Sequence, residues 1–183
     1  MQKFYIAAGA IFLLVFTANA QNINPTNTDI GFFEAQSGAV IVKGFATIGS
    51  MSVGDGILSV RCKESSNVST GRKLYGVAIE MATNAKREIL LVDDDEIDPL
   101  VNGIDYLSKI SYNVTTLPAF DASFVTKSGL RFVAYTAQRQ GGIQNFVQFT
   151  DEPRILLTAT QFAQFENLVS QAKNSIDALK NSR

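Results

Sequence analysis

The feature that most constrains the fold of this chain is a strand followed by a helix, a pattern that occurs twice. Residues 89–92 form a short apolar run, and residues 97–110 continue with apolar side chains three or four positions apart. Residues 155–158 and 162–179 repeat this arrangement near the C-terminus. Such spacing predicts amphipathic helices that cover a sheet. The two predicted faces consist of Ile97, Leu100, Val101, Ile104, Leu107 and Ile110, and of Phe162, Phe165, Val169, Ala172, Ile176 and Leu179.

Three more strands are predicted before each of these runs. Apolar residues at alternate positions, clearest at Leu58, Val60 and Cys62, are typical of strands with one buried face. The alternation predicts that Cys62 is an inward-facing core thiol. Gly44 interrupts the first predicted strand and is expected to mark a bend or bulge.

The sequence therefore predicts a single α+β domain over residues 38–183, with antiparallel sheets covered by two helices. It is expected to contain two ββββα units, at about residues 39–112 and 119–181. Residues 89–91 and 155–157 both read ILL, at an offset of 66 residues. The earlier strands share no identity, so the internal repeat is one of pattern, and a true duplication stays open.

Two ββββα units resemble the arrangement of the Whirly and PC4-like single-stranded DNA-binding families. Residues 155–176, a strand that leads into an amphipathic C-terminal helix, carry the closest likeness, and no family-specific motif accompanies it. This resemblance implies single-stranded nucleic acid as an alternative ligand. A competing layout is a seven-stranded barrel with one C-terminal helix, as in PH-like domains, with the helix at 97–110 as an insertion.

The N-terminus has the pattern of an export signal. Lys3 precedes an apolar centre at residues 6–16, and Ala18 and Ala20 provide the small side chains that signal peptidase requires. The apolar centre is too short to span a bilayer, which takes about 20 residues. We therefore expect a signal peptide at residues 1–20, a flexible polar arm at residues 21–37, a secreted or periplasmic location, and no membrane span after cleavage.

Composition excludes several kinds of chemistry. The chain has no histidine, so a Ser-His-Asp triad cannot form, and the commonest metal ligand is missing. Cys62 is the only cysteine, so no intramolecular disulfide can form. Loss of Lys3 with the signal peptide changes the formal net charge from −1 to −2. Such a charge argues against a general affinity for nucleic acid.

The acid run of Asp93, Asp94, Asp95 and Glu96, with Asp98, is the sharpest chemical candidate. Its spacing does not fit a calcium-binding EF-hand loop, because the central glycine and the distant glutamate are missing. Acids at a helix start bind free backbone N–H groups and oppose the positive end of the helix dipole. The sequence therefore favours a helix cap over a metal site, and a hydrolase that uses this run is kept as an alternative.

Seven basic residues lie in the first unit against four acids, Asp55, Glu64, Glu80 and Glu88. A nucleic-acid site would need these cations on one face with aromatic residues between them, and only Phe45 and Tyr75 lie among them. A solvated sheet face is the favoured interpretation. The seven are Lys43, Arg61, Lys63, Arg72, Lys73, Lys86 and Arg87.

The sequence thus predicts a non-enzymatic binding or structural module. An exposed sheet face or a cleft between the sheets would contact an unknown protein or a small ligand. No catalytic, cofactor-binding or metal-binding residue is assigned, and no cofactor is expected. A homodimer through the C-terminal helix is left open.

Overall fold

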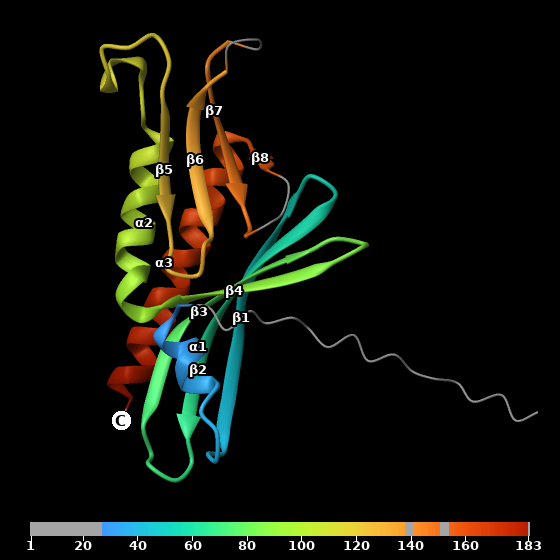
Figure 1. Cartoon of the computed structure of the whole chain (residues 1–183), viewed down its shortest axis with the longest axis vertical. Coiled ribbons are helices and arrows are strands. Elements are labelled where there is room, and N and C mark those ends of the chain that lie inside the picture. The colour runs from blue at the N-terminus through green and yellow to red at the C-terminus, as the bar shows by residue number, and fades with distance from the viewer. Residues whose placement is uncertain (1–26, 138–140, 151–153, 183) are drawn as a thin grey trace, which may run out of the picture.

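The computed structural model describes residues 27–137, 141–150 and 154–182, which form two four-stranded antiparallel sheets and three α-helices (Figure 1). Sheet A has the order β1-β2-β3-β4 and is followed by α2; sheet B has the order β5-β6-β7-β8 and is followed by α3. The predicted pair of ββββα units is confirmed, and the alternative of a seven-stranded barrel is wrong. The elements are α1 (Asp29–Glu34), β1 (Ile41–Val53), β2 (Gly56–Asn67), β3 (Lys73–Ala82), β4 (Arg87–Asp93), α2 (Asp94–Ser108), the 3-10 turn η1 (Tyr112–Val114), β5 (Asp121–Val125), β6 (Arg131–Thr136), β7 (Ile143–Gln148), β8 (Ile155–Leu157) and α3 (Ala159–Asn181).

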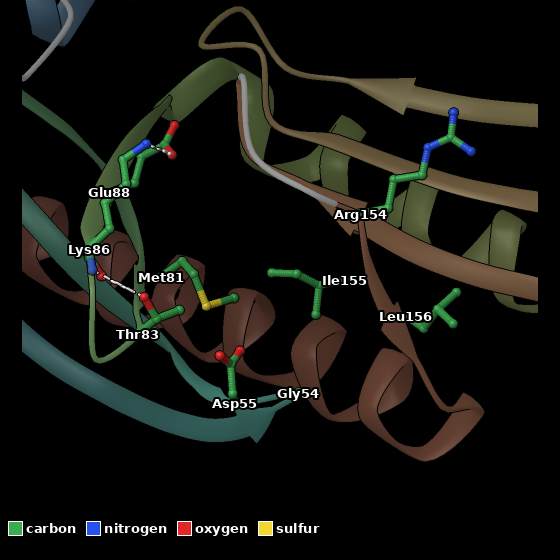
Figure 2. A pocket seen from close by; sticks show the side chains of 9 residues that line it. All are labelled: Gly54, Asp55, Met81, Thr83, Lys86, Glu88, Arg154, Ile155 and Leu156. Carbon is green, nitrogen blue, oxygen red and sulfur yellow. Dashed lines mark hydrogen bonds and ion pairs between the residues drawn. The ribbon is translucent and has the colours of Figure 1, made fainter.

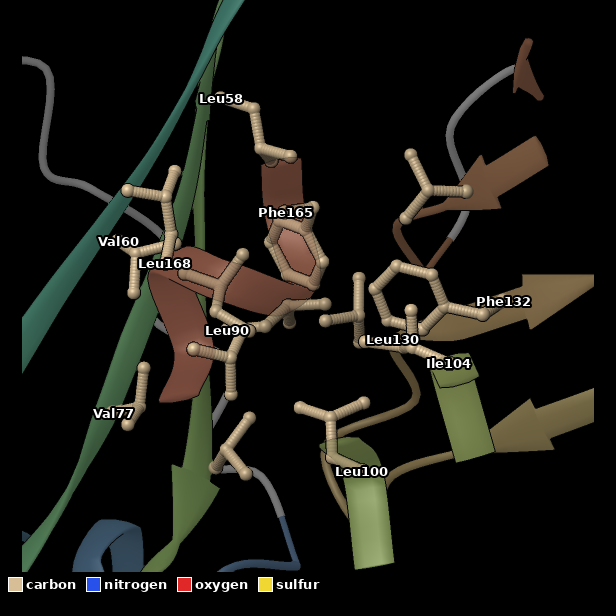
Figure 3. Packing of buried hydrophobic residues seen from close by; sticks show 14 of the residues in the cluster. Leu58, Val60, Val77, Leu90, Leu100, Ile104, Leu130, Phe132, Phe165 and Leu168 are labelled. Carbon is tan, nitrogen blue, oxygen red and sulfur yellow. The ribbon is translucent and has the colours of Figure 1, made fainter. Parts of the chain in front are cut away.

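One hydrophobic core fills the space between the two sheets and contains both long helices. The alternating residues of β2 and β3 point inward, so Leu58, Val60 and Val77 are fully buried, and Cys62 is buried as predicted. Phe165 of α3 lies between Leu58 and the sheet B residue Phe132, and the two phenyl rings are 5.0 Å apart (Figure 3). Both sheets therefore share a single core.

Each long helix packs on the sheet of the other unit as well as on its own sheet, an arrangement that we call the exchange of the helices. A Cβ atom at Gly49 of β1 would lie 2.6 Å from Leu168 of α3, so the helix of the second unit packs closely on sheet A. A Cβ atom at Gly103 of α2 would lie 2.5 Å from Phe124 of β5, so the helix of the first unit packs closely on sheet B. Each sheet is therefore covered in part by the helix that belongs to the other unit. Neither helix of the described residues is long and apolar enough to cross a membrane.

Two local boundaries differ from the sequence prediction. Gly44 pairs regularly with Glu64, and the bulge of β1 lies between Thr47 and Gly49 instead. The C-terminal helix begins at Ala159, three residues before the predicted face, and is capped by Thr158, with Gln161 completing a capping box. A capping box satisfies two backbone donors at once, which explains the earlier start.

The segment predicted to be a flexible arm contains helix α1. Its Ile30 and Phe33 are buried, and Ile30 packs on Ala78 and Leu91 of the outer face of sheet A. The backbone N–H groups of Asp29 and Ile30 donate to the Asp93 carboxylate at 2.8 and 3.0 Å. From residue 27 onward, the segment is thus docked. The predicted signal peptide and residues 21–26 lie outside the described residues.

Candidate functional site

The acid run at the start of α2 forms caps and ion pairs. Asp93 is the N-cap of α2, and Glu96 accepts the backbone N–H groups of Lys127 at 2.7 Å and of Asp93 at 3.4 Å. The Lys127 ammonium, in the turn between β5 and β6, lies 3.1 Å from Asp93 and 2.9 Å from Asp95. The hydrogen bond that Lys127 donates to Asp95 is the main cause that raises the pKa of Lys127, so this lysine stays charged.

Two further acids of the run bind lysines of α3. Asp94 lies 2.5 Å from Lys180, and Asp98 lies 3.6 Å from Lys173. Burial raises the pKa of Glu96, against the effect of its two backbone donors. Within the described residues, no group of three or more side chains is arranged to hold a metal ion. The acid run therefore joins α2 to sheet B and to α3, which extends the capping role that the sequence favoured.

The basic residues of the first unit are held by acids. On the outer face of sheet A, Glu34 of α1 lies 2.7 Å from Lys63 and 2.9 Å from Lys43. Glu80 lies 2.5 Å from Arg61 and 2.7 Å from Arg87. Phe45 is half exposed, with the Lys63 ammonium 4.8 Å and the Arg61 guanidinium 5.2 Å from its ring centre.

The other three basic residues also have partners. Lys73 lies 2.6 Å from Glu64, and Lys86 lies 3.5 Å from Glu88. The Arg72 guanidinium lies 5.5 Å from the centre of the Phe33 ring. The basic residues of the first unit are thus engaged in separate local contacts. Among the described residues, Phe45 is the only aromatic side chain that contacts two of these cations.

A groove of about 470 Å³ lies between the hairpin ends of sheet A and strand β8 of sheet B (Figure 2). The turn from β1 to β2 contributes Gly54 and Asp55, and the end of β3 contributes Met81. Strand β8 contributes Ile155 and Leu156 from the other side. The volume falls within the range of pockets that bind small molecules, about 300–1,000 Å³.

The groove combines apolar side chains with acids. Figure 2 shows the Asp55 carboxylate turned toward Met81 and Ile155. Asp55 has no hydrogen-bond or ion-pair partner among the residues that the structure describes. Glu88 accepts a hydrogen bond from Thr150 at 2.9 Å and has Lys86 3.5 Å away.

The remaining cation at the groove is turned away from it. Arg154 contributes to the wall, but its guanidinium lies 4.7 Å from the centre of the Phe146 ring, on the outer face of sheet B (Figure 2). Lys86 is engaged by Glu88. Among the described residues that line the groove, the charge without a partner is therefore the negative charge of Asp55.

Sequence reasoning did not find this groove. Its residues come from the β1–β2 turn, from the β3–β4 hairpin and from β8, and only the tertiary structure brings these segments together. Asp55 stands in the sequence only as a turn residue between Gly54 and Gly56. None of the acids of the run at 93–98 lines the groove.

Comparison with known proteins adds no family to the resemblance in architecture with the Whirly and PC4-like arrangement. No protein-family model, curated protein or solved structure gives a significant match to the chain. The two ββββα units are thus a feature of the fold that carries no family assignment.

Proposed function

We propose that this chain is an exported, non-enzymatic binding module that holds an organic cation with an apolar part in the groove between its sheets. The observation that carries the proposal is the Asp55 carboxylate, which has no partner among the described residues and faces an apolar wall of Met81 and Ile155. Small-molecule sites combine a mostly apolar lining with a few placed polar groups. A carboxylate beside apolar surface favours an ammonium group attached to a hydrocarbon chain.

The contacts of the acid run support binding rather than hydrolysis. Catalysis by paired carboxylates needs two acids in one cleft with different protonation states. Asp94 and Asp95 line a second hollow of about 410 Å³, but each is bound to a lysine ammonium, at 2.5 and 2.9 Å. Their contacts hold elements together, so we assign them a structural role.

Export is the part of the proposal that rests on the sequence. Lys3, the apolar centre at residues 6–16 and the small residues Ala18 and Ala20 support removal of a signal peptide and a secreted or periplasmic location. These residues lie outside the described part of the chain. The proposed ligand would then be met outside the cytoplasm.

Binding of single-stranded nucleic acid is less well supported than binding of a cation. Backbone phosphates need free cations, and stacking needs exposed aromatic rings. Lys63 and Arg61 lie beside Phe45, but Glu34 and Glu80 neutralise them at 2.7 and 2.5 Å. The outer face of sheet A is therefore not our proposed site.

A titration with hexylamine, followed by amide chemical shifts in NMR, tests the groove. We expect saturable shifts at Gly54, Asp55 and Ile155, and no such shifts with hexanoate, because that ligand carries the opposite charge. Asp55→Asn keeps the shape of the side chain and removes its charge. A charge-assisted hydrogen bond contributes about 1.5 kcal/mol, so the affinity should fall by about tenfold.

Asp121→Asn is the matched control, because Asp121 is an exposed acid on β5 outside the groove. It should leave the affinity for hexylamine unchanged. The proposal is wrong if hexylamine produces no saturable shifts at the groove, or if the Asp55→Asn variant binds it as well as the original chain does.

A further inference from the structure

The long edge strand β1 is open along half of its length. It has 13 residues and pairs only with β2 among the strands that the structure describes. Residues 42–47 are exposed, although their side chains alternate between the two faces of sheet A. In Figure 1, β1 forms the outer border of sheet A, with no element beside this half. Exposed strand edges of this length are templates for pairing with another chain.

The hydrogen bonds at the end of the β1–β2 ladder show which backbone groups face the open edge. The N–H of Val68 donates to the carbonyl of Val40 at 3.0 Å, so Val40 bonds toward β2. Bonding alternates along an antiparallel ladder, so Val42, Gly44 and Ala46 also bond toward β2. The N–H of Asn67 donates to Arg72 on the opposite side, at 2.9 Å, which agrees with this alternation. The open edge therefore presents the N–H and C=O groups of Ile41, Lys43, Phe45 and Thr47.

The usual protections of an edge strand are missing over residues 41–47. Proteins protect edges with free lysines, bulges or very short strands. The edge strands of sheet B, β5 and β8, have only 5 and 3 residues. In β1, the one charged residue, Lys43, is neutralised by Glu34 at 2.9 Å. The bulge lies farther along, between Thr47 and Gly49.

We propose that residues 41–47 of β1 pair antiparallel with the same residues of a second copy of this chain, which gives a two-fold dimer with one continuous eight-stranded sheet. An identical strand provides a partner of equal length. This inference does not depend on the ligand of the groove, because none of these residues lines it.

The side chains select one register of this pairing. A two-fold axis at Gly44 places Lys43 opposite Phe45 of the second copy, so that a cation meets an aromatic ring. It also places Val42, which is 55% exposed, opposite Ala46 of the second copy. An axis at Lys43 would place two lysines opposite each other, which is destabilising. An axis at Phe45 would place Ile41 opposite the bulge of the second copy, where regular pairing is interrupted.

Sedimentation velocity over a concentration series of the purified protein tests the dimer. We expect twice the monomer mass at high concentration. Phe45→Pro removes a donor from the open edge, and we expect it to shift the dissociation constant by at least tenfold. Phe45→Ala keeps that donor and loses only the ring, so its effect should be smaller. Circular dichroism checks that both variants keep the fold.

Cysteine cross-linking tests the register. Gly44→Cys is tolerated by the monomer, because the added Cβ would lie 3.9 Å from its nearest neighbour, the Glu64 carbonyl. In the proposed dimer the two Cys side chains sit at a non-hydrogen-bonded pair with Cα atoms about 4.5 Å apart, within disulfide range. Ala46→Cys is the matched control, because its two copies would be about 13 Å apart along the strands. Cys62 is buried and does not compete.

We expect an oxidised dimer with Gly44→Cys and none with Ala46→Cys. A protein that stays monomeric at several hundred micromolar, or a dimer that is indifferent to Phe45→Pro, would overturn the proposal. Cross-linking at position 46 without cross-linking at position 44 would overturn the register.

Discussion

At the scale of single residues, Asp93 has several structural roles at once. Its carboxylate accepts the N–H groups of Asp29 and Ile30 at 2.8 and 3.0 Å, and Lys127 donates to it at 3.1 Å. Asp93 is also the N-cap of α2 and is buried. One carboxylate thus connects α1, α2 and the β5–β6 turn.

Asp93→Asn should lower the free energy of unfolding by about 2–3 kcal/mol. Asparagine keeps the size and the capping ability of the residue, but its amide carries one acceptor oxygen and no charge, so it cannot serve all three donors. Urea denaturation measures the change. Asp95→Asn is the control, because Asp95 is 68% exposed and shares Lys127 only; its effect should stay below about 0.5 kcal/mol. Equal effects of the two variants would contradict the role of Asp93.

At the scale of elements, α1 depends on a buried ion pair. The Glu34 and Lys63 side chains are 6% and 5% exposed, and Ser65 also donates to Glu34. Burial alone would raise the pKa of Glu34, but hydrogen bonds from Lys63, Ser65 and Lys43 outweigh it and hold that pKa below its usual value. Burial lowers the pKa of Lys63, against the effect of Glu34.

The depressed pKa of Glu34 predicts a loss of stability in acid. A carboxyl whose pKa is lower in the folded state stabilises the fold above its unfolded pKa, about 4.3, and this contribution is lost as the pH falls through the folded pKa. The free energy of unfolding should therefore fall as the pH drops below about 5, and less steeply in Glu34→Gln.

The same variant has a second expected effect at neutral pH. Glu34→Gln leaves the Lys63 ammonium buried without its counter-charge, so it should cost about 3 kcal/mol at pH 7. Chemical denaturation at several pH values measures both effects. Glu166→Gln on α3 is the matched control and should keep the pH profile of the original chain. An unchanged profile in Glu34→Gln would contradict the role of the ion pair in docking α1.

At the scale of the whole molecule, the exchange of helices makes the two units interdependent. Helix α2 follows sheet A but approaches β5 closely at Gly103, and α3 follows sheet B but approaches β1 closely at Gly49. Both close approaches occur at glycine, which permits close packing because it has no side chain. Neither unit covers its own sheet completely.

Gly103→Ala tests this packing, because two effects oppose each other. In an exposed helix the change stabilises by up to about 1 kcal/mol. Here the added Cβ would lie 2.5 Å from Cδ2 and 2.8 Å from Cγ of Phe124, so the ring or the helix must move. We expect a net destabilisation of about 1–3 kcal/mol in urea denaturation. Asn102 is exposed on the same helix, so the control Asn102→Ala should be neutral or slightly stabilising. If Gly103→Ala stabilises the protein, α2 does not approach β5 so closely.

Short periodic patterns were enough to predict most elements. Alternation at Leu58, Val60 and Cys62 and the spacing of Ile97, Leu100 and Ile104 reflect burial on one face of a strand or helix, so the local sequence alone carries the signal. Helix α1 escaped prediction because six residues are too few to show a helical period. Its docking depends on Asp93, which is 63 residues away from Ile30 in the chain.

The sequence by itself determined the two ββββα units, most of the buried faces of the long helices and the capping role of the acid run, because each of these depends on neighbours within a few residues. Leu179 is the exception on the predicted face of α3, since it is 42% exposed. Only the tertiary structure decided the exchange of α2 and α3 between the sheets, the neutralisation of the basic residues and the groove beside Asp55. The physical reason is that these features arise where segments far apart in the chain meet. A local pattern of apolar and polar residues indicates that a side chain is buried, but it does not indicate which partner buries it.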